Sequence, residues 1–309
     1  MTDQKYRLVT RADFDGVVSG TLLLELDMID EIVFAEPKEI QDGLFEVTEN
    51  DILTNLPYVE KAHLCLDHHL SEVERVGERG NLIIDAKAPS AARVVYNHFG
   101  KGEKFPQICT DMLEAVDKAD AAQYNEEDIL APSPWVLLNF VLDPRTSLDR
   151  IGNFAISHEQ FMKDMMLYCR HHPVEEILKI PDVEERLHFY NLHEEFFERQ
   201  LKKCTQVHDN LVVFDLRHED EHYAGNRFTI YAIFPECNIS IQVIPEIEPG
   251  KCLLATGKSI LNRTSKTNVG SLMLKYGGGG HKQVGTCRIE NDRVDEVLAE
   301  LVKQITADG

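Results

Sequence analysis

The sequence is poor in several features that define large classes of protein. Its seven cysteines form no CxxC pair, so we expect buried, reduced thiols and neither a zinc site nor a disulfide framework. The longest apolar run, Trp135 to Leu142, is broken by Asn139 and is too short to span a bilayer. The amino-terminal residues lack the basic and apolar regions of a secretory signal. We therefore expect a cytoplasmic protein without a membrane partner.

Basic residues are also scarce. Lysine and arginine number 32 against 53 aspartates and glutamates, which gives a net charge of −21. We therefore expect no long duplex nucleic acid as a partner, because such binding depends on neutralising phosphates. Residues 251–289 are an exception, with seven basic residues and no acidic one. Such a local basic patch is compatible with a small phosphorylated or nucleotide substrate.

Strand-like and helix-like segments alternate in the first part of the chain, which predicts an α/β fold with a doubly wound, mainly parallel sheet. We expect strands at 6–10, 31–36, 62–67 and 81–85 and helices at 16–28, 89–99 and 106–122. A second, smaller α/β domain is expected to contain strands at 211–216, 228–234, 239–244 and 253–256 and helices at 269–276 and 294–305. The predicted domains are 1–190 and 208–309, joined by a helical linker at 191–207.

Two aspartates follow the first predicted strand, in the segment Arg11-Ala12-Asp13-Phe14-Asp15-Gly16. Residues i and i+2 of an extended chain point to the same side, so both carboxylates would face the crevice at the carboxyl end of the sheet. Carboxylates this close repel each other unless a cation or a proton lies between them. Taken alone, however, this motif is more typical of a solvated turn with a helix cap.

A second polar motif, Asp67-His68-His69, directly follows an apolar strand segment. Imidazoles at such a strand end can bind a metal, and a neighbouring carboxylate commonly orients them. Chance adjacency is the alternative, but the aspartate pair at another strand end favours the functional interpretation. Asp51, Asp117 and Asp120 are further candidates, although each alone is more typical of a solvated acid or a helix cap.

Four glycines, Gly277–Gly280, precede His281 and Lys282 inside the acid-free segment. Glycines permit a close backbone approach and leave amide groups available to an anion. A flexible loop is the alternative, but the basic surroundings favour phosphate binding.

The order of these motifs resembles that of the DHH phosphoesterase superfamily. The similarity is greatest to members with a DHH-associated C-terminal domain, which include RecJ-like nucleases, oligoribonucleases (nanoRNases) and exopolyphosphatase-related proteins. The resemblance covers nearly the whole chain and rests on DxDG, DHH and GGGGH in that order. It implies a metal-dependent hydrolase that uses two manganese ions, one of them weakly bound, or magnesium.

The resemblance also implies roles for individual residues. The implied metal ligands are Asp13, Asp15, Asp51, His68 and Asp120, with Asp51 as the bridging carboxylate and Asp120 a better match than Asp117. Asp67 is expected to support the His68 imidazole, and His69 to face the scissile phosphate. The implied clamp for substrate phosphate consists of Arg263, Gly278, Gly279, Gly280 and His281.

Arg11 departs from the family pattern. Relatives usually have His or Asp two positions before the first aspartate of this motif, and a guanidinium cannot donate a lone pair to a metal. The first metal site would then lose a ligand, or Arg11 would supply a fixed positive charge in its place. Whether one or two metals bind stays open at this point.

The resemblance favours hydrolysis of phosphodiester or phosphoanhydride bonds in short substrates. Short oligoribonucleotides or linear dinucleotides are the first expectation, and inorganic polyphosphate is the alternative substrate. A catalytically degenerate nucleotide-binding protein is the alternative from another class, and Arg11 motivates it. Formation of a homodimer also stays open.

Overall fold

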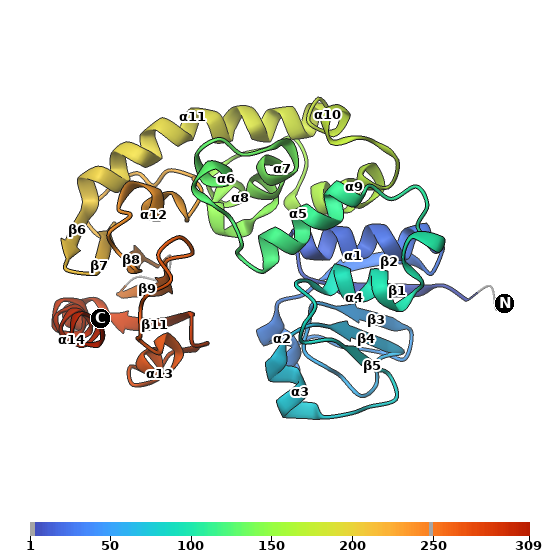
Figure 1. Cartoon of the computed structure of the whole chain (residues 1–309), viewed down its shortest axis with the longest axis horizontal. Coiled ribbons are helices and arrows are strands. Elements are labelled where there is room, and N and C mark those ends of the chain that lie inside the picture. The colour runs from blue at the N-terminus through green and yellow to red at the C-terminus, as the bar shows by residue number, and fades with distance from the viewer. Residues whose placement is uncertain (1–3, 247–249) are drawn as a thin grey trace. The chain divides into compact units, whose positions relative to one another are not determined.

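The chain folds into two compact units. The computed structural model describes residues 4–246 and 250–309. The first unit comprises the residues up to Gln123 and Pro132–Phe189, and the second comprises Tyr124–Ala131 and Tyr190–Gly309. Helix α11 (Pro181–Cys204), which was predicted as a long connector, runs from the first unit into the second (Figure 1). Among the described residues, no helix has both the length and the apolar character needed to cross a bilayer.

The first unit is built on a parallel sheet of five strands, in the order β2-β1-β3-β4-β5. The strands are β1 (Tyr6–Thr10), β2 (Ile29–Phe34), β3 (Asp51–Thr54), β4 (Leu64–Asp67) and β5 (Leu82–Ile84). This confirms the predicted α/β fold with its parallel sheet. Strand β3 was not predicted, because its four residues are too few to show a hydrophobic period.

Helices cover both faces of this sheet (Figure 1). One face carries α1 (Phe14–Glu25) and α4 (Ala91–His98), and α5 (Thr110–Asp120) and α9 (His158–His171) pack against α1. Gly20 allows α9 to come close, since a Cβ there would lie 2.4 Å from the sulfur of Met166. The other face carries α2 (Pro37–Gln41) and α3 (Leu70–Val76), around a core that includes Val9, Leu53 and Cys65.

Short helices complete the first unit between α5 and α11. They are α7 (Pro134–Leu142), α8 (Leu148–Ile151) and α10 (Val174–Ile177), with a 3-10 turn at Pro144–Thr146 between α7 and α8. Helix α6 (Glu126–Leu130) interrupts this region in sequence but belongs to the second unit, where it packs against α12 (Thr229–Ile233).

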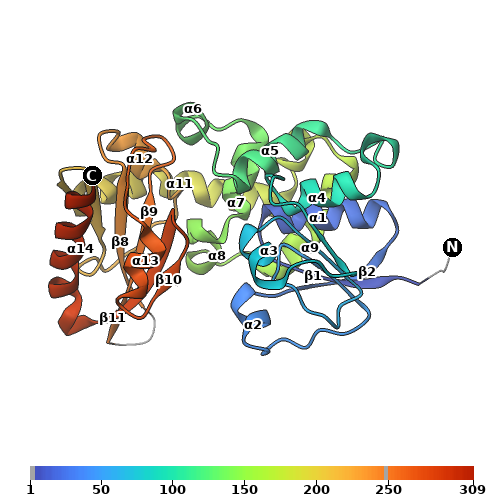
Figure 2. The same cartoon turned by 60° about the horizontal axis from the view of Figure 1, so that its bottom comes forward.

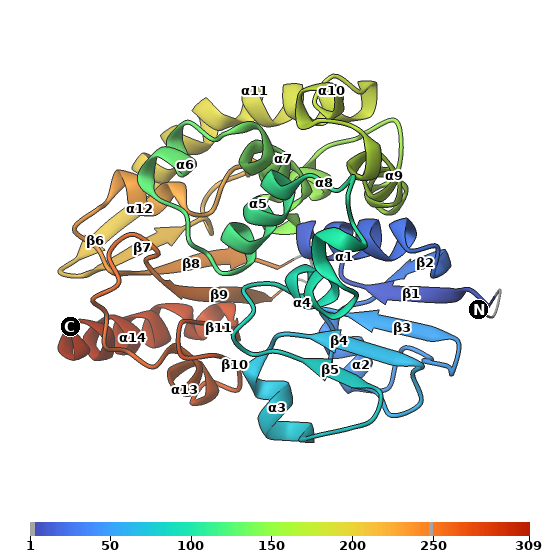
Figure 3. The same cartoon turned by 45° about the vertical axis from the view of Figure 1, so that its right-hand side comes forward.

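The second unit contains a six-stranded sheet in the order β10-β11-β9-β8-β7-β6 (Figure 2). Its strands are β6 (Thr205–His208), β7 (Leu211–Asp215), β8 (Ile239–Pro245), β9 (Lys251–Lys258), β10 (Gly279–Gly280) and β11 (Val284–Glu290). Only β7 and β8 run parallel among these pairs. Helices α13 (Val269–Leu274) and α14 (Val294–Asp308) lie on one face (Figure 3), and their apolar residues complete the core of this unit.

One predicted strand of the second unit is wrong. Residues 228–234 form helix α12 with its flanking residues, although their aromatic and β-branched side chains favour a strand locally. Tertiary contacts decide the outcome: Ile230 is buried, and the Tyr231 hydroxyl lies 2.8 Å from both the Ser240 hydroxyl and the Gly257 carbonyl oxygen.

Candidate metal centre

Three side chains with metal-binding atoms meet at the carboxyl end of the parallel sheet. Asp15 lies in the first turn of α1, His68 follows β4, and Asp120 is the last residue of α5. One ligand atom from each lies within 4.8 Å of the others. Parallel strands end at the same edge of a sheet, so motifs far apart in the sequence are brought together there.

Asp15 is held by the beginning of helix α4. Its two oxygens accept hydrogen bonds from the backbone amides of Ala92 and Ala91, at 2.7 and 2.9 Å. Burial and the nearby charge of Asp120 nevertheless raise the pKa of Asp15 well above its ordinary value. A buried carboxylate beside another carboxylate is therefore stabilised by a proton or by a cation.

The ring of His68 has one nitrogen fixed by the backbone and one directed at a carboxylate. Nδ1 lies 3.2 Å from the carbonyl oxygen of Ala88 and donates its proton there in the neutral ring. Nε2 lies 2.9 Å from Oδ2 of Asp120, yet it is a buried nitrogen without a hydrogen-bond partner among the described residues. Desolvation lowers the pKa of His68, but Asp120 and Asp15 outweigh it and raise the pKa to about 9.

These three residues fit a divalent cation. In the neutral ring the Nε2 of His68 is an acceptor, so it faces the Asp120 carboxylate as a second acceptor unless a positive charge lies near both. Two carboxylates and one imidazole are ordinary ligands of divalent metals in proteins, and the Nδ1 hydrogen bond of His68 is the support that such imidazoles usually have.

Asp67 is hydrogen-bonded to His69, and its predicted support of the His68 imidazole stays a prediction. Asp67 Oδ1 lies 2.8 Å from Nδ1 of His69, and its Oδ2 is buried without a hydrogen-bond partner among the described residues. The backbone is extended at both residues, so positions i and i+2 point to the same side, and a ligand atom of His68 also lies within 4.8 Å of ligand atoms of both residues.

Asp51 lies far from this cluster, and its prediction as the bridging metal ligand is wrong. It begins β3 and is in register with Arg7 of β1, at the edge of the sheet opposite to Asp13 and Asp15. Its carboxylate accepts hydrogen bonds from Arg7 Nε at 2.7 Å, from Arg7 Nη2 at 2.8 Å and from the amide of Thr48 at 2.7 Å. Because β3 was not recognised, the sequence did not indicate at which end of a strand Asp51 would lie.

The residue that does follow the carboxyl end of β3 is Asn55. Its side chain is buried, and Nδ2 lies 3.5 Å from Oδ1 of Asp13. Asp13 is the N-cap of α1, since the same Oδ1 accepts the Gly16 amide at 3.0 Å. Its other oxygen lies 3.1 Å from Nη1 of Arg11. Asp13 Oδ1 is therefore hydrogen-bonded, whereas its buried Oδ2 faces Arg11 without a hydrogen bond among the described residues, beside the cluster of Asp15, His68 and Asp120.

The two candidate aspartates of α5 have different surroundings. Asp117 is bonded to Arg93 Nε at 2.8 Å and to the Ser90 hydroxyl at 2.7 Å, so its carboxylate links α5 to α4. Asp120 faces His68. The structure thus favours Asp120 over Asp117 as a metal ligand.

Arg145 was not identified from the sequence. It lies in the 3-10 turn Pro144–Thr146, where its Nε is 3.2 Å from Asp143 Oδ1. The charge of Asp143, followed by those of Asp13 and Asp120, raises the pKa of Arg145. A single arginine in a short turn carries no sequence signal of such a position.

The glycine run of the second unit is shaped largely by its own backbone. A Cβ at Gly278 would lie 2.0 Å from the carbonyl oxygen of Thr286, and a Cβ at Gly280, where φ is 147°, would lie 2.3 Å from that of Val284. Gly279 is different, because nothing lies within 4 Å of its Cβ position. Two of the predicted phosphate-binding glycines therefore have a structural reason to be glycine, whereas Gly279 has none among the described residues.

Arg263 and His281 are both exposed in this unit. Arg263 Nε donates to the carbonyl oxygen of Ile260 at 2.9 Å. The backbone amide of His281 donates to the carbonyl oxygen of Val284, and its carbonyl oxygen accepts the amide of Gly270. The side chain takes no part in these two bonds. Their role in holding substrate phosphate stays a prediction.

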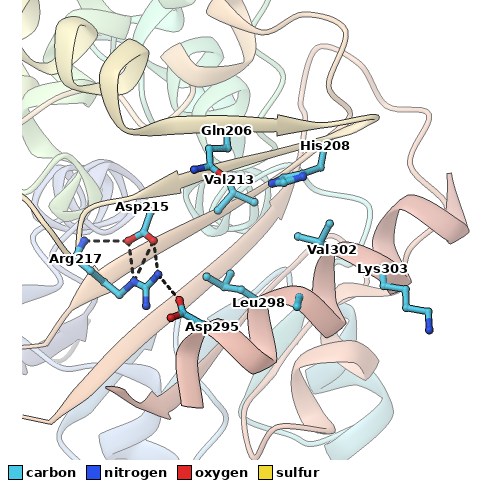
Figure 4. Close-up of a pocket in the computed structure, with 10 residues that line it drawn as sticks. Gln206, His208, Val213, Asp215, Arg217, Asp295, Leu298, Val302 and Lys303 are labelled. Carbon is cyan, nitrogen blue, oxygen red and sulfur yellow. Dashed lines mark hydrogen bonds and ion pairs between the residues drawn. The ribbon is translucent and has the colours of Figure 1, made fainter. Parts of the chain in front are cut away.

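A separate cavity of about 510 Å³ lies between α14 and strands β6 and β7 of the second unit (Figure 4). Its arginine, Arg217, is bonded to Asp215 at 2.7 Å and to Asp295 at 2.8 Å. This guanidinium is already neutralised by two carboxylates, so it is not available to a substrate phosphate.

Comparison with solved structures identifies the family. The pGpG-specific phosphodiesterase PggH from Vibrio cholerae matches with a TM-score of 0.88 and 50% sequence identity, over 99% of this chain and 100% of PggH. The chain belongs to the DHH phosphoesterase family. It is accordingly a hydrolase, and the resemblance seen in its motifs is confirmed.

More distant structures agree in fold. RecJ of Thermus thermophilus, solved in complex with Mn²⁺, matches with a TM-score of 0.53 and 12% identity, over 98% of this chain and 52% of RecJ. The Mg²⁺ complex of the same protein gives a TM-score of 0.52 at 11% identity. Neither the protein-family models nor the curated proteins gave a match.

Proposed function

We propose that this DHH-family hydrolase cleaves the phosphodiester bond of short linear dinucleotides of the pGpG type, in a metal-dependent reaction. The observation that carries the proposal is 50% identity to a pGpG-specific phosphodiesterase over essentially the full length of both chains. The cluster of Asp15, His68 and Asp120 supports it, because phosphodiester hydrolysis needs positive charge next to the phosphoryl oxygens.

In this proposal Asp15, His68 and Asp120 hold a divalent cation, manganese by preference or magnesium. When bound, the cation polarises a phosphoryl oxygen and lowers the pKa of water. The hydrogen bonds from Ala91 and Ala92 orient Asp15, and the carbonyl of Ala88 orients His68. The ligands are therefore held in place by the backbone before any substrate arrives.

We assign His69 the role of contacting the scissile phosphate. Its side chain is 40% exposed, and its Nδ1 is fixed by Asp67, whose carboxylate also raises the pKa of His69. The protonated ring holds a proton at Nε2 that can be donated to a phosphoryl oxygen or to the leaving oxygen.

The exposed groups of the second unit are assigned to another part of the substrate. Arg263, His281 and the open backbone at Gly279 are suited to bind a phosphate that is not cleaved. A cytoplasmic location and a homodimer stay predictions.

The substrate is tested by product analysis over time with pGpG, a longer oligoribonucleotide and inorganic polyphosphate, each with manganese, with magnesium or with a chelator. We expect pGpG to be converted to mononucleotides fastest and only with metal. Preferential consumption of polyphosphate would favour the phosphoanhydride alternative. Binding of pGpG without any product would favour a degenerate nucleotide-binding protein.

A further inference from the structure

The surroundings of Asp13 indicate how many cations the centre holds. We infer that the guanidinium of Arg11 takes the place of a second metal ion, so that the centre binds a single divalent cation. This inference rests on the proposed function in one respect, namely that Asp15, His68 and Asp120 are the metal ligands.

The first argument is geometric. In two-metal phosphoesterase sites the ions lie about 3.5–4 Å apart and share ligands. The carboxylate nearest to Asp15 along the chain is that of Asp13, but its Oδ2 is ion-paired with Arg11 Nη1 at 3.1 Å and its Oδ1 accepts the amide of Gly16. A guanidinium stays protonated and cannot coordinate a metal.

Arg11 is also fixed in this position. Its side chain is only 22% exposed, and its Nε is buried. Its backbone is fixed by Gly16, where a Cβ would lie 2.0 Å from the carbonyl oxygen of Arg11. Moving the guanidinium away from Asp13 would leave the buried carboxylate of Asp13 without its ion-pair partner, which is costly.

The second argument concerns the missing bridging carboxylate. At the end of β3 stands Asn55, which is 1% exposed and adopts a left-handed φ of 57°. Its Nδ2 faces Asp13, so its only free acceptor is the neutral Oδ1. A carboxylate offers two charged oxygens to bridge two ions, whereas this amide offers one neutral oxygen to a single neighbour.

The test is isothermal titration of Mn²⁺ into metal-free protein, with electron paramagnetic resonance of the bound ions. Wild type is expected to bind one ion and to give the spectrum of isolated Mn²⁺. The double variant Arg11→His with Asn55→Asp supplies an imidazole and a carboxylate at the same positions and is expected to bind two ions with spin coupling. Aspartate tolerates the left-handed backbone of position 55, so the variant should fold. Asp51→Asn, at the opposite edge of the sheet, is the matched control and should bind one ion.

The outcomes separate this inference from the proposed function. Two ions in wild type, both lost or weakened in His68→Ala, would overturn the inference and leave the metal centre in place. A folded double variant that still binds one ion would overturn the roles of Arg11 and Asn55. If His68→Ala binds manganese as wild type does, the metal centre itself is wrong and the proposed function fails with it.

Discussion

The Nε2 atom of His68 lies 2.9 Å from Oδ2 of Asp120, so two metal-binding atoms from a strand end and a helix end face each other. We expect His68→Ala to abolish stabilisation by manganese. For a ligand present at 100 times its dissociation constant, this stabilisation amounts to about 2.7 kcal/mol in the free energy of unfolding. Denaturant titrations with and without manganese measure it, and His172→Ala, which removes an exposed histidine paired with Glu176, is the control.

Protons should compete with the metal at this centre. Burial and Asp120 raise the pKa of Asp15, and the two carboxylates raise that of His68 despite desolvation. Metal binding needs both groups deprotonated, so the apparent affinity should rise with pH until about pH 9, and binding at neutral pH should release protons. Calorimetric titrations in two buffers with different heats of ionisation measure that release. An affinity independent of pH would contradict this description of the site.

Asp51 should contribute to stability and not to catalysis. We expect Asp51→Asn to lower the free energy of unfolding by roughly 1–3 kcal/mol at neutral pH, because it weakens the bonds to Arg7 and Thr48. Turnover and metal stoichiometry should stay unchanged. Loss of metal binding in this variant would restore Asp51 to the metal centre.

The effect of Asp51 should also depend on pH. Burial raises the pKa of Asp51, but Arg7 and the Thr48 amide outweigh burial and lower the pKa below its ordinary value of 3.8. The stabilisation is therefore complete above that value and is lost as the pH falls through the folded-state pKa. Urea denaturation of wild type and Asp51→Asn should show a difference that is constant near neutrality and shrinks below about pH 4.

Two neighbouring glycines should respond differently to alanine. Gly278→Ala places a Cβ against the Thr286 carbonyl and should destabilise the second unit by about 1–3 kcal/mol. Gly279→Ala has open space and should change stability by less than about 0.5 kcal/mol. If the glycine run binds substrate phosphate, Gly279→Ala should raise the Michaelis constant for pGpG with little change in turnover. An unchanged Michaelis constant would remove Gly279 from the substrate site.

The pattern of strands and helices predicted the parallel sheet, and Asp15 and His68 meet because their motifs follow strands that end at one edge of it. Asp120 follows no strand and was expected there only from the family resemblance. The sequence could not show at which end of a strand Asp51 lies, since β3 has only four residues and no visible hydrophobic period. It also could not decide which histidine Asp67 contacts, because that depends on the extended backbone of Asp67 and His69.

Other features depend on tertiary structure alone. Arg145 lies in a 3-10 turn that has no sequence signature, where the charges of Asp13 and Asp120 act on it. Asn55 was overlooked because an isolated asparagine carries no signal until β3 places it beside Asp13. Residues 228–234 have the composition of a strand, and only the contacts of Ile230 and Tyr231 make them a helix.

The most direct test of the account is hydrolysis of pGpG after metal is restored to chelator-treated protein, in wild type, Asp120→Asn and Asp117→Asn. Both aspartates lie in the last turn of α5, but only Asp120 faces His68. We expect manganese to restore wild-type activity, Asp120→Asn to stay at least about 100-fold slower, and Asp117→Asn to recover substantially if it folds. Equal recovery in Asp120→Asn, or wild-type hydrolysis that persists without metal, would contradict the assignment of the metal centre.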